Sequence, residues 1–128
     1  MKTPAIVKID PYLAPHADDL ALRMDNYAQK RRELVGEDGS LVDFANGHEY
    51  FGIHPTADGW VYREWAPAAE AMFFTGDFNG WDTAACQMTR LEGGVFEVTL
   101  ADKDALRVGQ KVQAIVWHGG EMLRRVPT

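Results

Sequence analysis

From Tyr50 onward the sequence is divided into short apolar runs separated by turn residues, and this division constrains the fold more than any other feature. The runs recur at intervals of roughly 8–12 residues, a spacing typical of an antiparallel β-sandwich. They are Tyr50–His54, Trp60–Trp65, Ala71–Gly76, Gln87–Leu91, Val95–Leu100, Gln110–Trp117 and Met122–Val126. We therefore expect a mainly β fold in this part of the chain.

Turn residues between these runs predict three hairpins. Asp58–Gly59, Gly93–Gly94 and Gly119–Gly120 each separate two runs, and such dipeptides favour tight turns. Apolar and polar residues alternate most clearly in Val95–Leu100, so one face of that strand should cover a core. The residues on that face are Phe96, Val98 and Leu100.

The first 48 residues follow a helical pattern instead. Apolar residues recur with helical spacing between Ala17 and Val35, and Gly36 stops the pattern. They are Leu20, Met24, Tyr27 and Leu34. Ser40 begins a capping-box pattern with Asp43, which predicts a second, shorter helix with Gly47 as its C-terminal signal. We expect a helical N-terminal segment over residues 1–48 and a β-sandwich over residues 49–128.

Composition limits which cellular compartment and which binding partners we expect. The chain has 128 residues, of which 46% are hydrophobic and 25% charged, as in an ordinary globular domain with a terminal extension. It has one cysteine, Cys86, and its N-terminus lacks a signal-peptide pattern, so we expect a cytoplasmic protein without an intramolecular disulfide. No apolar stretch approaches the roughly 20 residues of a membrane span. A net charge of −6 disfavours nucleic acid and is compatible with a neutral polymer.

Two motifs in register carry a resemblance to a known family. Tyr62–Ala69 and the following Thr75–Asp82 resemble the N-terminal module of glycoside hydrolase family 13 branching enzymes, classed as carbohydrate-binding module family 48. Asp10–Leu13 and Gly47–Gly52 are similar to the helical leader that precedes this module in eukaryotic-type enzymes. Arg124–Pro127 is similar to the segment that leads into their catalytic barrel.

The resemblance implies both a fold and a function. The fold would be an immunoglobulin-like antiparallel β-sandwich, preceded by a short helical segment and followed by a barrel after residue 128. The partner would be an α-1,4-glucan such as glycogen, amylose or a malto-oligosaccharide. The parent enzyme would be a glycosyltransferase that cleaves an α-1,4 link and rejoins the chain as an α-1,6 branch. The present chain would have no catalytic activity and need no cofactor.

The second motif contains the strongest candidate for glycan contact. Gly76 and Gly80 bracket a tight loop in which Asp77 and Asn79 can bond neighbouring backbone amides. Such a loop presents Trp81 at its edge. A rigid aromatic face suits the apolar C–H face of a pyranose ring, while polar side chains at the margin meet its hydroxyls. The candidate glycan-binding residues are Trp81, Asn79, Trp117 and Trp60.

Packing is the alternative for each of these aromatic residues. Trp81 could pack against the sandwich edge, and Trp60 follows a turn and could serve either role. Relatives that bind glycogen strongly carry a second tryptophan just after a hairpin, where this chain reads Gly120–Leu123, so Trp117 would have to substitute from the other side of the turn. Tyr62 and Trp65 lie within a strand, and we expect them to pack in the core or at the sheet edge.

Catalytic and metal sites are not indicated. Glu64, Asp77 and Asp82 could suggest a glycosidase pair, but each has a local role in a turn or at a strand edge. The four histidines and Cys86 lack metal-ligand spacing, and no glycine-rich phosphate loop is present. Two roles stay open, namely glucan binding and purely structural packing on the catalytic barrel. Only the fold recommends a third role, as a protein-interaction domain.

Overall fold

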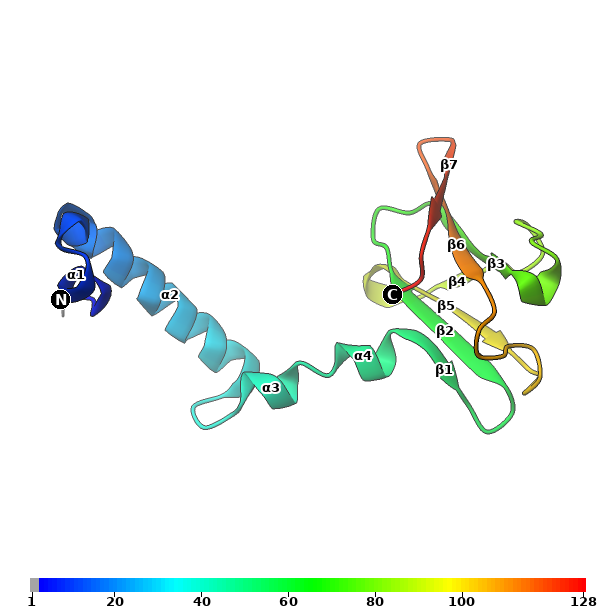
Figure 1. The fold of residues 1–128 in the computed structure, drawn as a ribbon, viewed down its shortest axis with the longest axis horizontal. Helices are drawn as coiled ribbons and strands as arrows, with labels where there is room; N and C mark the ends of the chain where they lie inside the picture. Colours follow the sequence, from blue (N-terminus) through cyan, green and yellow to red (C-terminus); the bar gives the residue numbers. More distant parts are fainter. Residues whose placement is uncertain (1–2) are drawn as a thin grey trace. The chain divides into compact units, whose positions relative to one another are not determined.

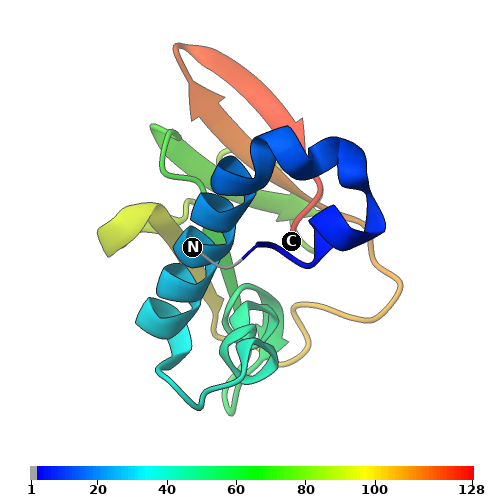
Figure 2. The same cartoon turned by 90° about the vertical axis from the view of Figure 1, so that its left-hand side faces the viewer.

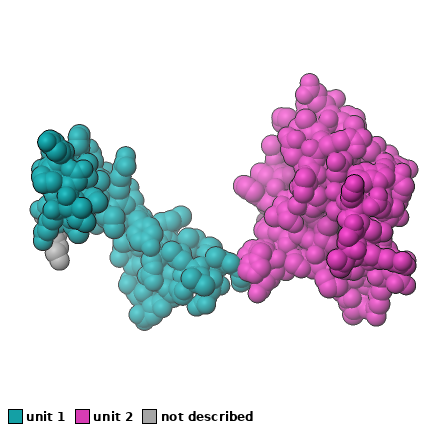
Figure 3. All heavy atoms as spheres, viewed as in Figure 1, with its two compact units in different colours: residues 1–46 teal, residues 47–128 magenta. Residues whose placement is uncertain are grey.

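The computed structural model describes residues 3–128 and divides the chain into two compact units, Met1–Asn46 and Gly47–Thr128 (Figures 1 and 3). This division lies close to the domain boundary predicted at residues 48 and 49. The domain assignment itself stays a prediction. Within residues 3–128, no helix is long and apolar enough to cross a membrane.

Unit 1 is helical. Its elements are α1 (Ile6–Ile9), the 3₁₀ helix η1 (Pro11–His16), α2 (Ala17–Val35) and α3 (Leu41–Phe44). The long helix α2, coloured blue to cyan in Figures 1 and 2, has the bounds predicted from the sequence. It ends where Gly36 adopts a φ of 73°, a value that glycine accommodates without strain. The Ser40 hydroxyl caps α3 by accepting from the Val42 amide, as expected.

The prediction for Gly47 was wrong. This glycine does not follow the second helix as a stop signal, because α3 already ends at Phe44 and Ala45 leaves the helical region with a ψ of 57°. Gly47 instead begins another helical turn, α4 (Gly47–Tyr50), which the Phe51 amide closes by donating to the Gly47 carbonyl. Two single turns therefore stand where one helix was predicted.

The apolar face predicted on α2 is not covered within unit 1. Among the described residues of this unit, Ala21 is the buried hydrophobic side chain. Met24, Tyr27 and Leu34 are all exposed by 41% or more. The periodicity therefore identified the helix correctly without identifying a core.

Unit 2 is a sandwich of two antiparallel sheets, which confirms the predicted immunoglobulin-like fold. The first sheet has the order β1 (Gly52–Pro55), β2 (Trp60–Trp65), β5 (Val95–Leu100) and β4 (Thr89–Arg90). The second has the order β3 (Ala71–Gly76), β6 (Val112–His118) and β7 (Glu121–Arg125). The hairpins predicted at Asp58–Gly59, Gly93–Gly94 and Gly119–Gly120 join β1 to β2, β4 to β5 and β6 to β7.

The core lies between the two sheets. Its largest fully buried aromatic side chains are Tyr62, Phe74 and Phe96, and the rings of Tyr62 and Phe74 lie 4.8 Å apart. Val98 and Leu100 pack against the same cluster as Phe96, which confirms the alternation predicted for β5. Because successive side chains of a strand point to opposite faces, the residues next to these core residues in the sequence face outward. Trp117 lies on such an outward face, whereas Trp60 packs against the core.

Candidate functional site

The loop after β3 is built around the side chain of Asn79. Its Oδ1 accepts from the Gly76 amide at 3.1 Å and from the Thr75 hydroxyl at 3.2 Å. Its Nδ2 donates to the carbonyls of Phe74 and Asp82 at 3.3 and 3.2 Å. The prediction that Asn79 bonds neighbouring backbone groups is confirmed. Because the amide is engaged on both sides, Asn79 shapes the loop from within.

Trp81 stands at the edge of this loop. Its ring is 37% exposed, and its indole Nε1 donates to Asp77 Oδ1 at 3.0 Å. The other carboxylate oxygen of Asp77 accepts from the Lys111 amide at 2.8 Å. The Lys111 amide first, and then the Trp81 indole, hold the pKa of Asp77 below its usual range. At neutral pH the carboxylate is therefore ionised and fixed to two partners.

Trp117 lies on the outward face of the second sheet. In β6 it stands opposite Ala71 of β3 on one side and Met122 of β7 on the other. Trp117 is 36% exposed and Met122 41% exposed. Met122, which belongs to the segment Gly120–Leu123 that lacks the second tryptophan, is thus the direct cross-strand neighbour of Trp117. The ring and the flexible thioether form one apolar strip.

The structure places Trp81 and Trp117 at opposite ends of β3. Trp117 pairs with Ala71, the first residue of that strand, whereas the Trp81 loop begins after its last residue, Gly76. Five residue steps at the usual strand rise correspond to about 17 Å. The two rings therefore lie well apart, one at each end of β3.

Trp60 is in a different environment. It is half-buried, packs against the core, and donates from Nε1 to the Lys103 carbonyl at 3.0 Å. It borders a small groove with Leu106 and Gln110. The structure does not bring Trp60 onto the outward face that carries Trp117.

Trp65 departs from the prediction. Tyr62 is buried as expected, with 1% exposure, but Trp65 is 62% exposed and is the most exposed of the four tryptophans. The signal was present in the sequence, because the two residues are three positions apart in one strand, and an odd offset places them on opposite faces. The Trp65 indole Nε1 donates to the Gly93 carbonyl at 3.0 Å, which fixes the ring.

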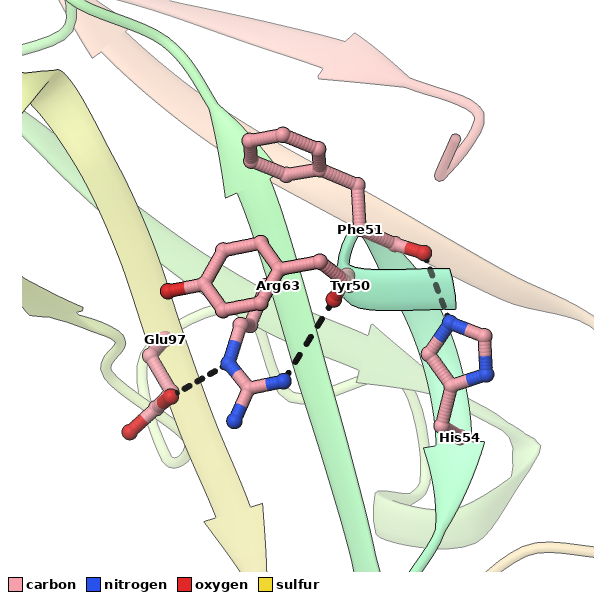
Figure 4. Close-up of polar contacts among 5 residues, drawn as sticks. All are labelled: Tyr50, Phe51, His54, Arg63 and Glu97. Carbon is pink, nitrogen blue, oxygen red and sulfur yellow. Dashed lines mark hydrogen bonds and ion pairs between the residues drawn. The ribbon is translucent and has the colours of Figure 1, made fainter. Parts of the chain in front are cut away.

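Arg63 lies on the same face of β2 as Trp65, and it contacts side chains of neighbouring elements (Figure 4). Arg63 donates from Nε to the Glu97 carboxylate at 2.6 Å, and its guanidinium carbon lies 4.4 Å from the centroid of the Tyr50 ring. Beside this cluster, His54 Nε2 lies 2.7 Å from the Phe51 carbonyl oxygen. Trp65 also borders an apolar groove with a volume of about 430 Å³. Other residues that line it are Pro67, Met72, His118, Leu123 and Arg125.

Comparison with protein families decides the assignment. The family model described as carbohydrate-binding module 48 (isoamylase N-terminal domain) matches residues 50–124. The chain belongs to carbohydrate-binding module family 48. The match covers the sandwich up to residue 124 of β7, and it contains Trp60, Trp65, Trp81 and Trp117.

Relatives of this family 48 module are branching enzymes. The 1,4-alpha-glucan-branching enzyme of Equus caballus is 35% identical over 127 residues, covering 94% of this chain and 18% of that enzyme. The enzyme of Emericella nidulans is 38% identical over 128 residues, covering 95% and 19%. Among solved structures, pullulanase type I from Bacillus subtilis str. 168 matches 77% of this chain and 12% of its own with 26% identity and a TM-score of 0.49. The chain spans about a fifth of the length of the curated relatives named here.

The carboxylates of the family 48 module are engaged by its own hydrogen-bond donors. Glu64 accepts from the Tyr62 hydroxyl at 2.6 Å and from the amide and hydroxyl of Thr128. Asp82 accepts from the amides of Ala84 and Ala85. Burial, together with the bond to Glu64, raises the pKa of Tyr62. Within residues 3–128, no group of three His, Cys, Asp or Glu side chains has a geometry that could hold a metal ion.

Proposed function

We propose that this chain is the N-terminal α-glucan-binding module of a 1,4-α-glucan branching enzyme. It positions chains of glycogen, of a starch-like polymer or of malto-oligosaccharide for α-1,4 to α-1,6 transfer by a catalytic domain outside this chain. The observation that supports glucan binding is the partly exposed Trp81 ring, whose indole N–H group is already bonded to the protein. It donates to the Asp77 carboxylate at 3.0 Å.

Anchored indoles suit the recognition of sugar rings. A bonded N–H restrains the rotation of the ring, so less conformational freedom is lost when a pyranose stacks on it. The exposed face offers a flat apolar surface for the C–H groups of the sugar. Within this arrangement Trp81 is the principal platform. Trp117 with Met122 forms a second platform, and Asn79 contributes by shaping the loop.

Binding by the isolated chain is expected to be weak. With two separate platforms of one ring each, we expect dissociation constants for linear malto-oligosaccharides on the order of millimolar, or roughly 4 kcal/mol. Polymeric glucan offers many equivalent segments, which raises the apparent affinity through multivalency. The polymer is therefore the more sensitive probe.

Retardation in a native gel tests this function. The chain should migrate more slowly in a gel that contains glycogen or amylopectin than in a gel without polymer, and maltoheptaose should restore its mobility. Equal mobility in both gels would contradict glucan binding.

We also propose that the chain has no catalytic activity of its own. The three carboxylates that could suggest a glycosidase accept hydrogen bonds from the module itself, and these bonds support a structural role for them. Incubation with amylose should leave iodine staining unchanged and give no α-1,6 signal by NMR. A new branch signal would refute this assignment.

A second candidate role is structural, namely packing on the catalytic domain. The apolar groove beside Trp65, with Leu123 and Val126 in its wall, favours it. This role predicts normal mobility in the glucan gel, so the same experiment separates the two candidates.

A further inference from the structure

We propose that Asp77 is a positioning residue for Trp81, and that Trp81 contacts glucan through its ring face alone. This inference rests on the proposed function, since it takes Trp81 as a glucan platform. It assigns to Asp77 the task of holding the platform ready before any sugar arrives.

The backbone conformation at Trp81 requires stabilising contacts from its surroundings. Trp81 has a φ of 63°, and it is the one non-glycine residue with a positive φ among residues 3–128. This left-handed conformation is unfavourable for a residue with a Cβ atom and persists only where its surroundings impose it. The Trp81 amide donates to the Gly76 carbonyl at 2.9 Å, and the indole Nε1 donates to Asp77. Backbone and side chain are thus both held to the first residues of the loop.

Asp77 is itself fixed to Lys111, the residue just before β6. Its amide donates to the Lys111 carbonyl at 3.0 Å, and its Oδ2 accepts from the Lys111 amide at 2.8 Å. The two backbone segments approach so closely here that a Cβ atom on Gly76 would lie 2.4 Å from the Lys111 carbonyl oxygen. The carboxylate therefore links the Trp81 ring to the residue that precedes β6.

The bond also limits what Trp81 can offer a ligand. An indole has one polar donor, and Asp77 occupies it. A sugar hydroxyl could gain that donor only by displacing a carboxylate, which is a stronger acceptor. Contact through the ring face remains, so hydroxyl recognition must come from other side chains.

Four single variants and one double variant separate positioning from general loop stability. Asp77→Ala removes both acceptors, whereas Asp77→Asn retains one acceptor and presents a donor at the second position. Asp82→Ala is the matched control, because the Asp82 carboxylate caps the Ala84 and Ala85 amides in the same loop without touching Trp81. Trp81→Ala removes the platform, and Trp81→Ala with Asp77→Ala completes a double-mutant cycle.

Two readouts on the ¹⁵N-labelled chain, titrated with maltoheptaose, test the proposal. In Asp77→Ala the Trp81 indole N–H resonance should move upfield, and its proton should exchange faster with water. The dissociation constant for maltoheptaose should rise about 3- to 10-fold, as expected for one side chain that must be ordered on binding. Asp77→Asn should be intermediate. Asp82→Ala should leave both readouts unchanged. In the Trp81→Ala background, Asp77→Ala should have no further effect.

The outcomes distinguish this inference from the function on which it rests. Wild-type affinity in Trp81→Ala would remove Trp81 from the glucan site and overturn this inference, whereas an absence of binding by the unsubstituted chain would contradict the proposed function. Weaker binding in Trp81→Ala but wild-type affinity in Asp77→Ala would overturn positioning while leaving the platform in place. A further loss on adding Asp77→Ala to Trp81→Ala would show that Asp77 acts independently of the ring, and an equal loss in Asp82→Ala would reduce its role to loop stability.

Discussion

At the scale of single residues, hydrogen bonds to indole N–H groups fix the orientation of the tryptophans. Trp60 donates to Lys103, Trp65 to Gly93 and Trp81 to Asp77. Two of these acceptors are backbone carbonyls, which no substitution removes. The acceptor for Trp81 is a side chain, so the orientation of this ring depends on a residue that can be replaced.

Replacing Trp81 by Ala should strongly reduce retardation in a glycogen gel while the fold is kept. The ring is partly exposed at a loop edge, so its removal leaves little cavity behind. Far-ultraviolet circular dichroism and the melting temperature should stay close to those of the wild type. Undiminished retardation of a folded Trp81→Ala protein would show that the glycan platform lies elsewhere.

Tyr62 should make stability fall in alkaline solution. Burial raises its folded-state pKa above that of the unfolded chain, which is about 10. The contribution is therefore fully present below pH 10 and is lost as pH rises further towards the folded-state pKa, because only the unfolded chain then releases the proton. Urea unfolding at pH 9 and pH 11 measures this loss. Tyr62→Phe should reduce it, whereas Tyr27→Phe, at an exposed position, should not.

At the scale of elements, the sequence predicts strands well where turn residues limit them on both sides. The bounds of β2, β3 and β5 agree with the predicted runs. The run Gln87–Leu91 is different, since its regular strand is limited to Thr89–Arg90. Gln87 bridges to Phe73 of the second sheet, while Thr89 pairs with Glu97 of the first. The segment crosses between sheets, and hydrophobic pattern alone cannot show which sheet a residue joins.

The candidate site could also be predicted from the sequence only in part. The loop around Asn79 follows from glycine and side-chain capping, which are local properties of the sequence. The cross-strand pairing of Trp117 with Met122 follows from a two-residue hairpin. The exposure of Trp65 depends on which face of β2 meets the core, and it follows from the alternation of the strand, because Trp65 lies three positions after the buried Tyr62. The single-turn helices α1 and α4 were not predicted because they are too short to show a period.

Close approach at the end of β3 should make Gly76 intolerant of a side chain. A Cβ atom there would clash with the Lys111 carbonyl oxygen, so we expect Gly76→Ala to lower the free energy of unfolding by about 2–3 kcal/mol. Gly80→Ala is the matched control, since a Cβ atom meets nothing within 4 Å and the cost is limited to strain at φ 65°, about 1 kcal/mol. Urea unfolding of both variants measures the difference. Equal losses of unfolding free energy in the two variants would mean that the backbone segments at Gly76 and Lys111 do not approach each other so closely.

At the scale of the whole molecule, the hydrophobic core belongs to unit 2. The buried cluster is built from residues of the two sheets, whereas the described part of unit 1 has Ala21 as its buried hydrophobic residue. Short helices without a packed face are marginally stable in water. Cooperative stability should therefore reside in residues 47–128.

Truncation tests this division. A chain of residues 47–128 should unfold cooperatively and retain the near-ultraviolet circular dichroism of its buried aromatic residues. A peptide of residues 1–46 should show weak helicity that decreases gradually on heating. Loss of cooperative unfolding in the 47–128 chain would show that the sandwich depends on the helical segment.

The most direct test of glucan binding is a chemical-shift titration of the ¹⁵N-labelled chain with maltoheptaose, with a β-1,4-linked oligosaccharide of equal length as the control. We expect the shifted amides to lie in residues 76–82 and 115–122, with weak affinity and little response to the control. Shifts that avoid both segments would show that the glucan site has been assigned to the wrong surface. An absence of shifts at millimolar ligand would contradict glucan binding and favour a structural role.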